Sequence, residues 1–433
     1  MLIIYTPDIT PRLSYIVKFL LSRILDLNYE ITSDIEYYQN SAKPKLTYSD
    51  KPFQNEPFIT AHNLLFETNI EEQKITISKN NDFITLFENK KNDLLLFDVF
   101  AASFYLISRY EEYTCQCRDE HDRFKAEQSF AFKNNFLDQP IVDQWAFLLK
   151  EKLTAIYPTL EFTKRTFNYI PTFDIDQAFA IQQKGSIRIT SGILKSLLKI
   201  NLKDVIFRIR VLRGKKPDPF NTFSIIKRLN KQKKIKPYFF FLLGKYGKYD
   251  KNISPNNTKF KRLVSYFSKN YITGIHPSYV SHKNIAVLQC ELSSLESITQ
   301  KKITHSRQHF LRISFPETFQ NLIKAEIKND FSLGYASQIG FRASTCTPFF
   351  FYDLTAEKET NLVLFPFCVM DVTLKNYMNL TTEQSIEKIT KLVNTIKSVN
   401  GTFISLWHNE SLSNHGEWKN WQEVYKQMLE ITR

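Results

Sequence analysis

Two aspartates in the segment Pro171–Asp176 are the residues of this chain best suited to chemistry. Phe173 and Ile175 alternate with Asp174 and Asp176, and this strand-like period of two places both carboxylates on one face. Two like charges at a strand end influence each other's protonation and can share a metal ion or a proton. A strand-to-helix junction, in which Asp176 only caps the next helix, fits the same pattern.

Two histidines that could complete a metal site lie in the later segment Gly274–His282. His276 stands where an expected strand ends, and His282 follows in the loop after it. One carboxylate with two imidazoles is a common ligand set for a divalent metal, and it leaves positions open for water and substrate. The sequence therefore allows a metal site made of one of the two aspartates with His276 and His282, although a loop histidine is more often only hydrogen-bonded.

Further polar residues follow other apolar segments of the chain. Arg342, in Gly340–Thr345, is placed to pair with one of the aspartates and hold it ionised, with a surface salt bridge as the alternative. His408 follows an apolar segment and is a candidate general acid, with Asp371 as the carboxylate beside it. A core histidine bonded to the backbone explains that segment equally well. Arg307 and His309, after another expected strand, lie on the same rim and are candidate substrate-binding residues.

The elements that must position these residues alternate between strand and helix from Phe167 onward. Strands are expected at 167–174, 237–243, 272–275, 304–306, 333–336, 362–365 and 402–406, with helices at 223–231, 257–268, 285–297, 317–327 and 382–399. This alternation predicts an α/β fold with a parallel sheet, either open or closed into a barrel. Chemistry in such folds lies at the carboxyl ends of the strands, where the residues above fall.

The front of the chain is expected to form a separate, smaller domain. Residues 1–163 show short strands and helices typical of an α/β or α+β unit, and residues 164–433 form the second domain. The boundary near 158–165 has a proline, then charged residues, then a fresh strand. No catalytic arrangement is recognisable in the front domain, so its role is open.

Composition narrows the classes of function. With 10 glycines in 433 residues, the chain has neither a G-x-G-x-x-G nor a Walker A phosphate loop. Five cysteines without paired zinc-type spacing, and a start without a signal-peptide pattern, lead us to expect a cytoplasmic protein. The formal net charge of +14 allows an anionic partner, but no nucleic-acid-binding module is recognisable, so nucleic acid is not expected.

One segment, 184–220, concentrates positive charge. It holds ten lysines and arginines against two aspartates, with apolar residues interleaved. A basic amphipathic segment can make peripheral contact with an anionic membrane. A long loop with solvated lysines is the alternative, which we favour by roughly two to one.

Together these segments resemble the polysaccharide deacetylase, or NodB-homology, superfamily of carbohydrate esterases, from about Phe167 to the C-terminus. The residues that match its motifs, in order, are Phe173–Asp176, His276, Arg342, Asp371 and Leu406–His408. The first motif has D-x-D in place of adjacent aspartates, the second is H-x5-H rather than H-x-x-x-H, and Arg342 lacks the usual Pro-Tyr after it. These features are similar to a divergent branch in Bacteroidota proteins, in which an uncharacterised domain comes first.

The resemblance implies a distorted (β/α) barrel of the NodB-homology type behind the front domain. It implies metal-dependent removal of acetyl groups from a glycan or glycan precursor in surface-polysaccharide metabolism. The second hypothesis is a catalytically inactive barrel that binds a glycan or a lipid-linked sugar in a polysaccharide-assembly complex. Metal content distinguishes the two.

The resemblance also implies roles for single residues. Asp176, His276 and His282 would hold a divalent metal, usually zinc. Asp174 would be the general base, kept ionised by Arg342, and His408 with Asp371 would protonate the leaving group. Tyr279 and Trp407 would stack on sugar rings.

Overall fold

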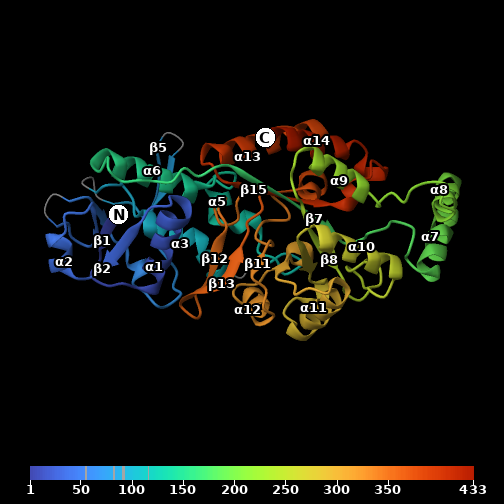
Figure 1. The fold of residues 1–433 in the computed structure, drawn as a ribbon, viewed down its shortest axis with the longest axis horizontal. Coiled ribbons are helices and arrows are strands. Elements are labelled where there is room, and N and C mark those ends of the chain that lie inside the picture. Colours follow the sequence, from blue (N-terminus) through green and yellow to red (C-terminus); the bar gives the residue numbers. More distant parts are fainter. Residues whose placement is uncertain (54–55, 81–82, 90–92, 116) are drawn as a thin grey trace.

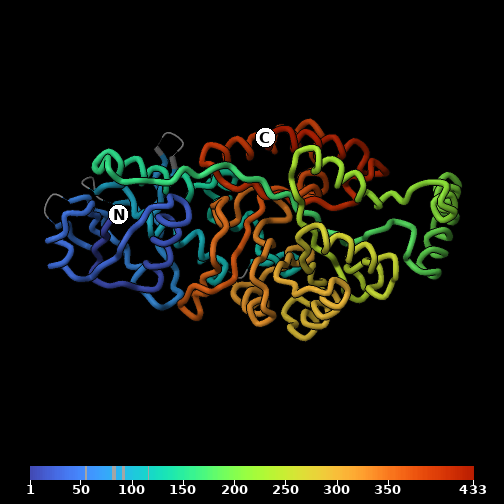
Figure 2. Tube along the Cα trace, in the orientation of Figure 1, coloured from blue at the N-terminus to red at the C-terminus, as the bar shows by residue number. Residues whose placement is uncertain are grey.

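The computed structural model describes residues 1–53, 56–80, 83–89, 93–115 and 117–433. The molecule is elongated, with the N-terminal sheet at one end and a helical hairpin, α7–α8, at the other (Figure 1). The trace in Figure 2 shows the C-terminal helices lying along one side of the molecule.

The front region is built on a four-stranded parallel sheet of order β2-β1-β3-β4. Its strands are β1 (Leu2–Tyr5), β2 (Tyr29–Thr32), β3 (Lys45–Ser49) and β4 (Phe58–Thr60). Strand β1 is buried along its whole length, which is typical of a parallel sheet covered on both faces. A separate antiparallel hairpin consists of β5 (Ile77–Asn80) and β6 (Phe83–Leu86).

Helices cover this sheet. They are α1 (Pro11–Val17, continued as a π-helical segment to Ile24), α2 (Ile35–Asn40), α3 (Val99–Ile107), α4 (Tyr110–Thr114), α5 (Phe130–Lys133) and α6 (Ile141–Ile156). Arg109, between α3 and α4, has a left-handed backbone with φ of 56°. This turn redirects the chain and brings the carboxylate of Glu112 to the buried guanidinium of Arg109, at 2.8 Å.

Asp98 is the buried N-cap that connects α3 to the front sheet. Its Oδ1 accepts from the backbone N–H groups of Phe100 and Ala101, and its Oδ2 accepts from the Tyr48 hydroxyl (2.7 Å) and the His62 N–H (2.8 Å). We expect Asp98→Ala to lower the free energy of unfolding by about 2 to 4 kcal/mol, because buried donors lose their acceptor.

Urea unfolding of the full chain measures this loss, and Asp34 provides the matched control. Asp34 caps α2 through a single bond, to the N–H of Tyr37, at an exposed position. Asp34→Ala should therefore cost at most about 1 kcal/mol. Equal losses in the two variants would show that the buried bonds of Asp98 add no stability.

The second region contains a nine-stranded sheet of order β12-β13-β11-β10-β9-β8-β7-β15-β14. Its strands are β7 (Asn168–Ile175), β8 (Tyr238–Leu242), β9 (Thr273–His276), β10 (His305–Ser306), β11 (Asn329–Asp330), β12 (Phe349–Asp353), β13 (Lys358–Leu364), β14 (Val369–Met370) and β15 (Thr402–His408). Neighbouring strands are parallel except for the β12–β13 pair, so the mixed α/β class predicted from the sequence is confirmed.

One expected strand, 333–336, is wrong. The strand in this part of the chain is β11, which ends at Asp330. The Asp330 carboxylate accepts from both the N–H and the hydroxyl of Ser332, each at 2.9 Å, so these donors are taken locally rather than by a neighbouring strand. The chain therefore leaves the ladder directly after Asp330.

The strand ladder is open, with β12 and β14 at its two ends. The chain after β13 nevertheless forms hydrogen bonds with residues near two well-separated strands of the sheet, β11 and β15. Phe367 donates its N–H to the carbonyl of Leu333 (3.1 Å), and Cys368 donates to that of Ile404 (3.2 Å). The sheet therefore curves, and residues 367–368 connect the segment after β11 with strand β15.

Helices flank this sheet (Figure 1). They are α9 (Phe223–Gln232), α10 (Thr258–Asn270), α11 (Ile285–Thr299), α12 (Glu317–Lys324), α13 (Thr382–Ser398) and α14 (Trp421–Ile431). In the described part of the chain, no helix combines the length and apolar character needed to cross a bilayer.

The favoured loop in 184–220 is wrong, because the structure has two antiparallel helices there. They are α7 (Ser186–Leu198) and α8 (Leu202–Leu212). Ile200 turns the chain with φ of 55°, and the Asn201 side chain accepts from the N–H of Asp204 to cap α8.

Candidate active site

The carboxyl ends of the parallel strands converge on one polar cavity. Asp174 and Asp176 stand at the end of β7, and Asp174 lies in register with His408 of the neighbouring strand β15. His276 ends β9, two strands away. The cavity has a volume of about 150 Å³ and all four of these residues line it. The expected placement of Asp174 and Asp176 on one face of a strand is therefore what the structure has.

Asp176, His276 and His309 form the group that could hold a metal ion. One ligand atom from each lies within 4.8 Å of the other two. The Nε2 of His276 is 3.2 Å from Asp176 Oδ1, and the Nε2 of His309 is 3.4 Å from Asp176 Oδ2. Both rings are buried, whereas the Asp176 side chain is 25% exposed, so solvent reaches the group from the aspartate side.

The other ring nitrogen of each histidine is held by a second partner. The Nδ1 of His276 lies 2.5 Å from the carbonyl oxygen of Arg307. The Nδ1 of His309 lies 2.8 Å from Oδ1 of Asp250, in the loop after β8. Partners at Nδ1 fix the ring orientation and the tautomer, as is usual for metal-bound histidines. Each ring therefore presents Nε2 to Asp176.

The residues fit a divalent metal. Asp176 Oδ1 is buried and accepts no hydrogen bond from any residue that the structure describes. Burial opposes its charge, but His309, His276 and His408 hold the pKa of Asp176 well below its usual range. Two imidazoles and one ionised carboxylate are a donor set typical of catalytic zinc, with a position left for substrate or water.

Metal binding at this site should compete with protons. Burial opposes the charge of His309, but Asp176 and Asp250 raise its pKa to about 9. The ring must lose that proton before Nε2 can coordinate a metal.

The expectation for His282 is corrected by the structure. Its Nε2 lies 3.4 Å from Asp122 Oδ2 and 3.3 Å from the hydroxyl of Ser314, outside the metal group. A short helical turn at Tyr279–Ser281 carries the chain away from the end of β9. The second imidazole comes instead from His309, three residues after β10, which is the direct neighbour of β9.

The expectation that Arg342 pairs with the catalytic aspartate is also corrected. Arg307 takes this role, because its Nη1 donates to Asp174 Oδ1 at 2.9 Å and its Nε donates to the carbonyl of Phe331. Arg342 instead donates to both carboxylate oxygens of Glu112, in the front region, at 2.9 and 2.6 Å. Arg307 directly follows β10, whereas Arg342 lies in the long segment between β11 and β12.

His408 and Asp371 form the expected pair. The Nδ1 of His408 lies 2.8 Å from Asp371 Oδ1, and its backbone N–H donates to Oδ2. The Nε2 points toward the metal group, 3.9 Å from Asp176 Oδ2. Burial disfavours a charged ring, but Asp371, followed by Asp176 and Asp174, raises the pKa of His408 to about 10. The ring therefore carries a proton at neutral pH.

Trp407 was expected to bind substrate, and this expectation is wrong. Leu406 and His408 line the cavity, so strand alternation places Trp407 on the opposite face. Trp407 is fully buried and packs edge-to-face on Tyr425. Tyr279 is half-buried and stacks on Tyr249, with 4.1 Å between ring centres, but it does not line the cavity.

Sequence reasoning missed several cavity residues. Glu410 follows β15, and burial raises its pKa to about 7 although His408 opposes this. Arg123 comes from the front region and is held by Asp119 Oδ2 at 2.7 Å and by the carbonyl of Phe310 at 3.1 Å. Asp250 and Glu410 lie in loops after strands, so the carboxyl-end rule could have found them. No local signal marks Arg123.

The comparisons with known proteins give a family only for the front of the chain. Residues 2–158 match a family model described as a family of unknown function, DUF7033. No curated protein matches the chain. The match covers the region in which the sequence shows no catalytic arrangement, and it assigns no activity.

Several solved structures show distant likeness. A provisionally named polysaccharide deacetylase of Mycobacterium smegmatis is 11% identical with a TM-score of 0.39, over 62% of this chain and 84% of that one. The polysaccharide deacetylase Bc1974 of Bacillus cereus is 10% identical with a TM-score of 0.27, over 62% and 88%. A 4-alpha-glucanotransferase of Thermococcus litoralis is 12% identical with a TM-score of 0.35, over 62% and 37%. Likeness at this level assigns neither a fold family nor a function.

Proposed function

We propose that the protein is a metal-dependent hydrolase that removes acetyl groups from a glycan or glycan precursor. One observation carries this proposal. The metal group Asp176–His276–His309 lies within 4 Å of two further pairs, Asp174 with Arg307 and His408 with Asp371. This is the layout of residues that the polysaccharide deacetylase superfamily uses, with His309 and Arg307 in the positions that the sequence had assigned to His282 and Arg342.

The reaction is hydrolysis of an acetamide or an acetyl ester. When bound, the metal supplies Lewis-acid activation of the water and of the acetyl carbonyl group. Asp174 accepts the proton of the attacking water, and its bond to Arg307 keeps Oδ1 in place. A bond forms between the water oxygen and the carbonyl carbon. As the bond to the sugar nitrogen or oxygen breaks, Nε2 of His408 donates the proton that the leaving group takes up.

Two buried charged pairs favour this function over the catalytically inactive barrel. Arg307 and Asp371 are both fully buried, and each holds its partner through a charged hydrogen bond. Burying charged groups is costly unless they are paired, and a site used only for binding has no need of both a base and an acid beside a metal group. The same proposal includes a NodB-type barrel as the fold of the second region. It also includes a cytoplasmic role in surface-polysaccharide synthesis.

Metal content tests the site. We expect untagged protein reconstituted with zinc to hold about one ion per chain, and Asp176→Ala, His276→Ala and His309→Ala each to lose it. His282→Ala is the matched control, since it removes a buried histidine of the same rim outside the metal group, and it should keep the metal. If the His309→Ala variant kept its metal and the His282→Ala variant lost it, the second histidine ligand would be His282, as the H-x5-H spacing suggested.

Acetate release tests the activity. We expect the zinc-loaded protein to release acetate from acetylated chito-oligosaccharides or from p-nitrophenyl acetate, and the His309→Ala variant to release none above background. A protein that binds one metal per chain but shows no acetate release from any acetylated sugar would favour the inactive glycan-binding barrel.

A further inference from the structure

The hairpin α7–α8 presents an unusual amount of apolar surface to solvent. Eight of the 21 exposed large apolar side chains in the described residues lie between 187 and 212. The three most exposed are also here, namely Ile200 (84%), Ile187 (80%) and Leu198 (77%). A surface patch of this kind on an otherwise polar protein marks an interaction site.

These side chains form a stripe rather than a scatter. Ile187, Leu194 and Leu198 lie seven and four residues apart, so they share one face along the whole of α7. Ile200 and Leu202 extend the stripe through the turn to the start of α8. At 1.5 Å per residue, the part on α7 is about 17 Å long. Figure 1 shows the hairpin standing away from the sheets, and the exposed fractions of these side chains show that the stripe faces solvent.

The hairpin is also strongly basic. The segment 184–220 carries ten lysines and arginines and two aspartates. Both aspartates accept hydrogen bonds from neighbouring groups of the protein, although the side chain of Asp204 is 30% exposed. Asp204 accepts from Arg208 at 2.7 Å, and the buried Asp218 accepts the N–H groups of residues 180–182 at its root. The charge that faces outward is therefore positive.

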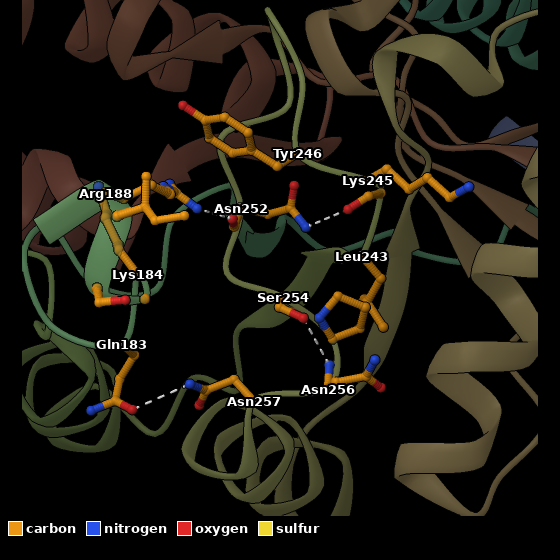
Figure 3. Close-up of a pocket in the computed structure, with 15 residues that line it drawn as sticks. Gln183, Lys184, Arg188, Leu243, Lys245, Tyr246, Asn252, Ser254, Asn256 and Asn257 are labelled. Atoms are coloured by element: carbon orange, nitrogen blue, oxygen red, sulfur yellow. Dashed lines mark hydrogen bonds between the residues drawn. The ribbon is translucent and has the colours of Figure 1, made fainter. Parts of the chain in front are cut away.

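A cavity at the root of the hairpin has the same character. It has a volume of about 900 Å³, and its lining includes Lys184, Arg188 and Lys245 but no acidic residue. Figure 3 shows Lys184 and Arg188 on one wall and Leu243 and Asn256 on the other. Arg188 donates to the carbonyls of Asn252 and Lys251. Ile187 belongs both to this lining and to the apolar stripe, so the two features are continuous.

We propose that the α7–α8 hairpin docks the protein on an anionic lipid bilayer. α7 lies in the plane of the membrane surface, with Ile187, Leu194 and Leu198 at the boundary of the acyl chains. The lysines and arginines beside them contact the phosphate groups of the lipids, and long basic side chains reach these groups readily from an apolar face. Leu and Ile cannot stack on nucleic-acid bases, so the exposed stripe favours lipid over a nucleic acid.

Vesicle co-sedimentation of the full chain tests this proposal without reference to catalysis. We expect binding to vesicles of phosphatidylcholine mixed with phosphatidylglycerol to be about tenfold or more tighter than to phosphatidylcholine alone, and to weaken as salt is added. The double variant Leu198→Glu/Ile200→Glu should lose about tenfold or more in binding, as should the charge variant Lys199→Glu/Lys203→Glu.

Matched controls separate the hairpin from overall charge. Ile9→Glu/Ile156→Glu replaces two exposed apolar residues outside the hairpin and changes net charge by the same amount as Leu198→Glu/Ile200→Glu, so it should bind within about twofold of wild type. Thermal unfolding confirms that each variant is folded. Full binding by the Leu198→Glu/Ile200→Glu variant, or no binding of wild type to mixed vesicles, would overturn the proposal. A further contradicting result would be that wild type is a dimer, and that the Leu198→Glu/Ile200→Glu variant is a monomer with unchanged vesicle binding. A second copy of the chain, and not a membrane, would then cover the stripe.

Discussion

The Asp174→Asn variant is expected to lose acetate release by about 10²- to 10⁴-fold while it keeps its metal. Asparagine has the shape of aspartate and its side-chain oxygen can still accept from Arg307, but it cannot take a proton from water. Asp174 is outside the metal group, so zinc content should stay near one ion per chain. Steady-state kinetics on the zinc-loaded protein, with metal content measured on the same sample, gives both readouts.

Two controls make this result specific. Asp330→Asn changes a buried carboxylate at the end of strand β11 of the same sheet, where it contacts Ser306 and Ser332 but does not line the cavity. It should keep activity within about threefold. An equal loss in Asp330→Asn would mean that Asp174→Asn acts through the fold. Loss of zinc by Asp174→Asn would instead make Asp174 a ligand.

Substitutions of Arg307 and Arg342 should have different effects on acetate release. Arg307→Met removes the donor that holds Asp174 and should lower turnover steeply at unchanged metal content. Arg342→Met breaks a pair with Glu112 and should act mainly on stability. The reverse outcome would restore Arg342 to the catalytic role expected from the sequence.

The second large effect concerns Glu112, which joins the front region to the second region. Its carboxylate is fully buried and pairs with Arg109 and Arg342. We expect Glu112→Gln to lower the free energy of unfolding at neutral pH by about 3 to 5 kcal/mol, because two buried guanidinium groups lose a shared anion. Urea unfolding followed by tryptophan fluorescence measures this, and an exposed pair is the control. Asp138→Asn breaks the surface pair with Lys391 and should cost at most about 1 kcal/mol.

The same group gives the stability a defined pH dependence. Burial opposes the charge of Glu112, but Arg342 and Arg109 hold its pKa at about 2, below the ordinary value of 4.5. Because the folded-state pKa is lowered, the stabilisation is fully present above pH 4.5 and is lost as pH falls from about 4.5 toward 2. The difference corresponds to about 3 kcal/mol. Glu112→Gln should therefore show a flatter loss of stability across this window, and an unchanged profile would contradict the role of Glu112.

Predictions from the sequence succeeded where the signal was local. Alternation along residues 173–176 and the apolar segments before His276 and His408 placed all of these side chains at strand ends. The hairpin α7–α8 was missed because its apolar residues face solvent, so the usual link between an apolar stripe and a buried face fails there. Trp407 was misplaced although the alternation that puts it in the core is readable from the sequence.

The sequence by itself indicated the α/β class and the paired aspartates at the end of β7, and it named Asp371 as one possible partner of His408. Only the tertiary structure decided that His309 replaces His282, that Arg307 replaces Arg342, and that the front region supplies Arg123. The physical reason is that chain spacing sets which side chains end a strand, whereas the lateral order of strands sets which ends meet. β10 lies directly beside β9, so Arg307 reaches Asp174 and His309 lines the cavity. The spacing of residues along the chain does not reveal this order of strands.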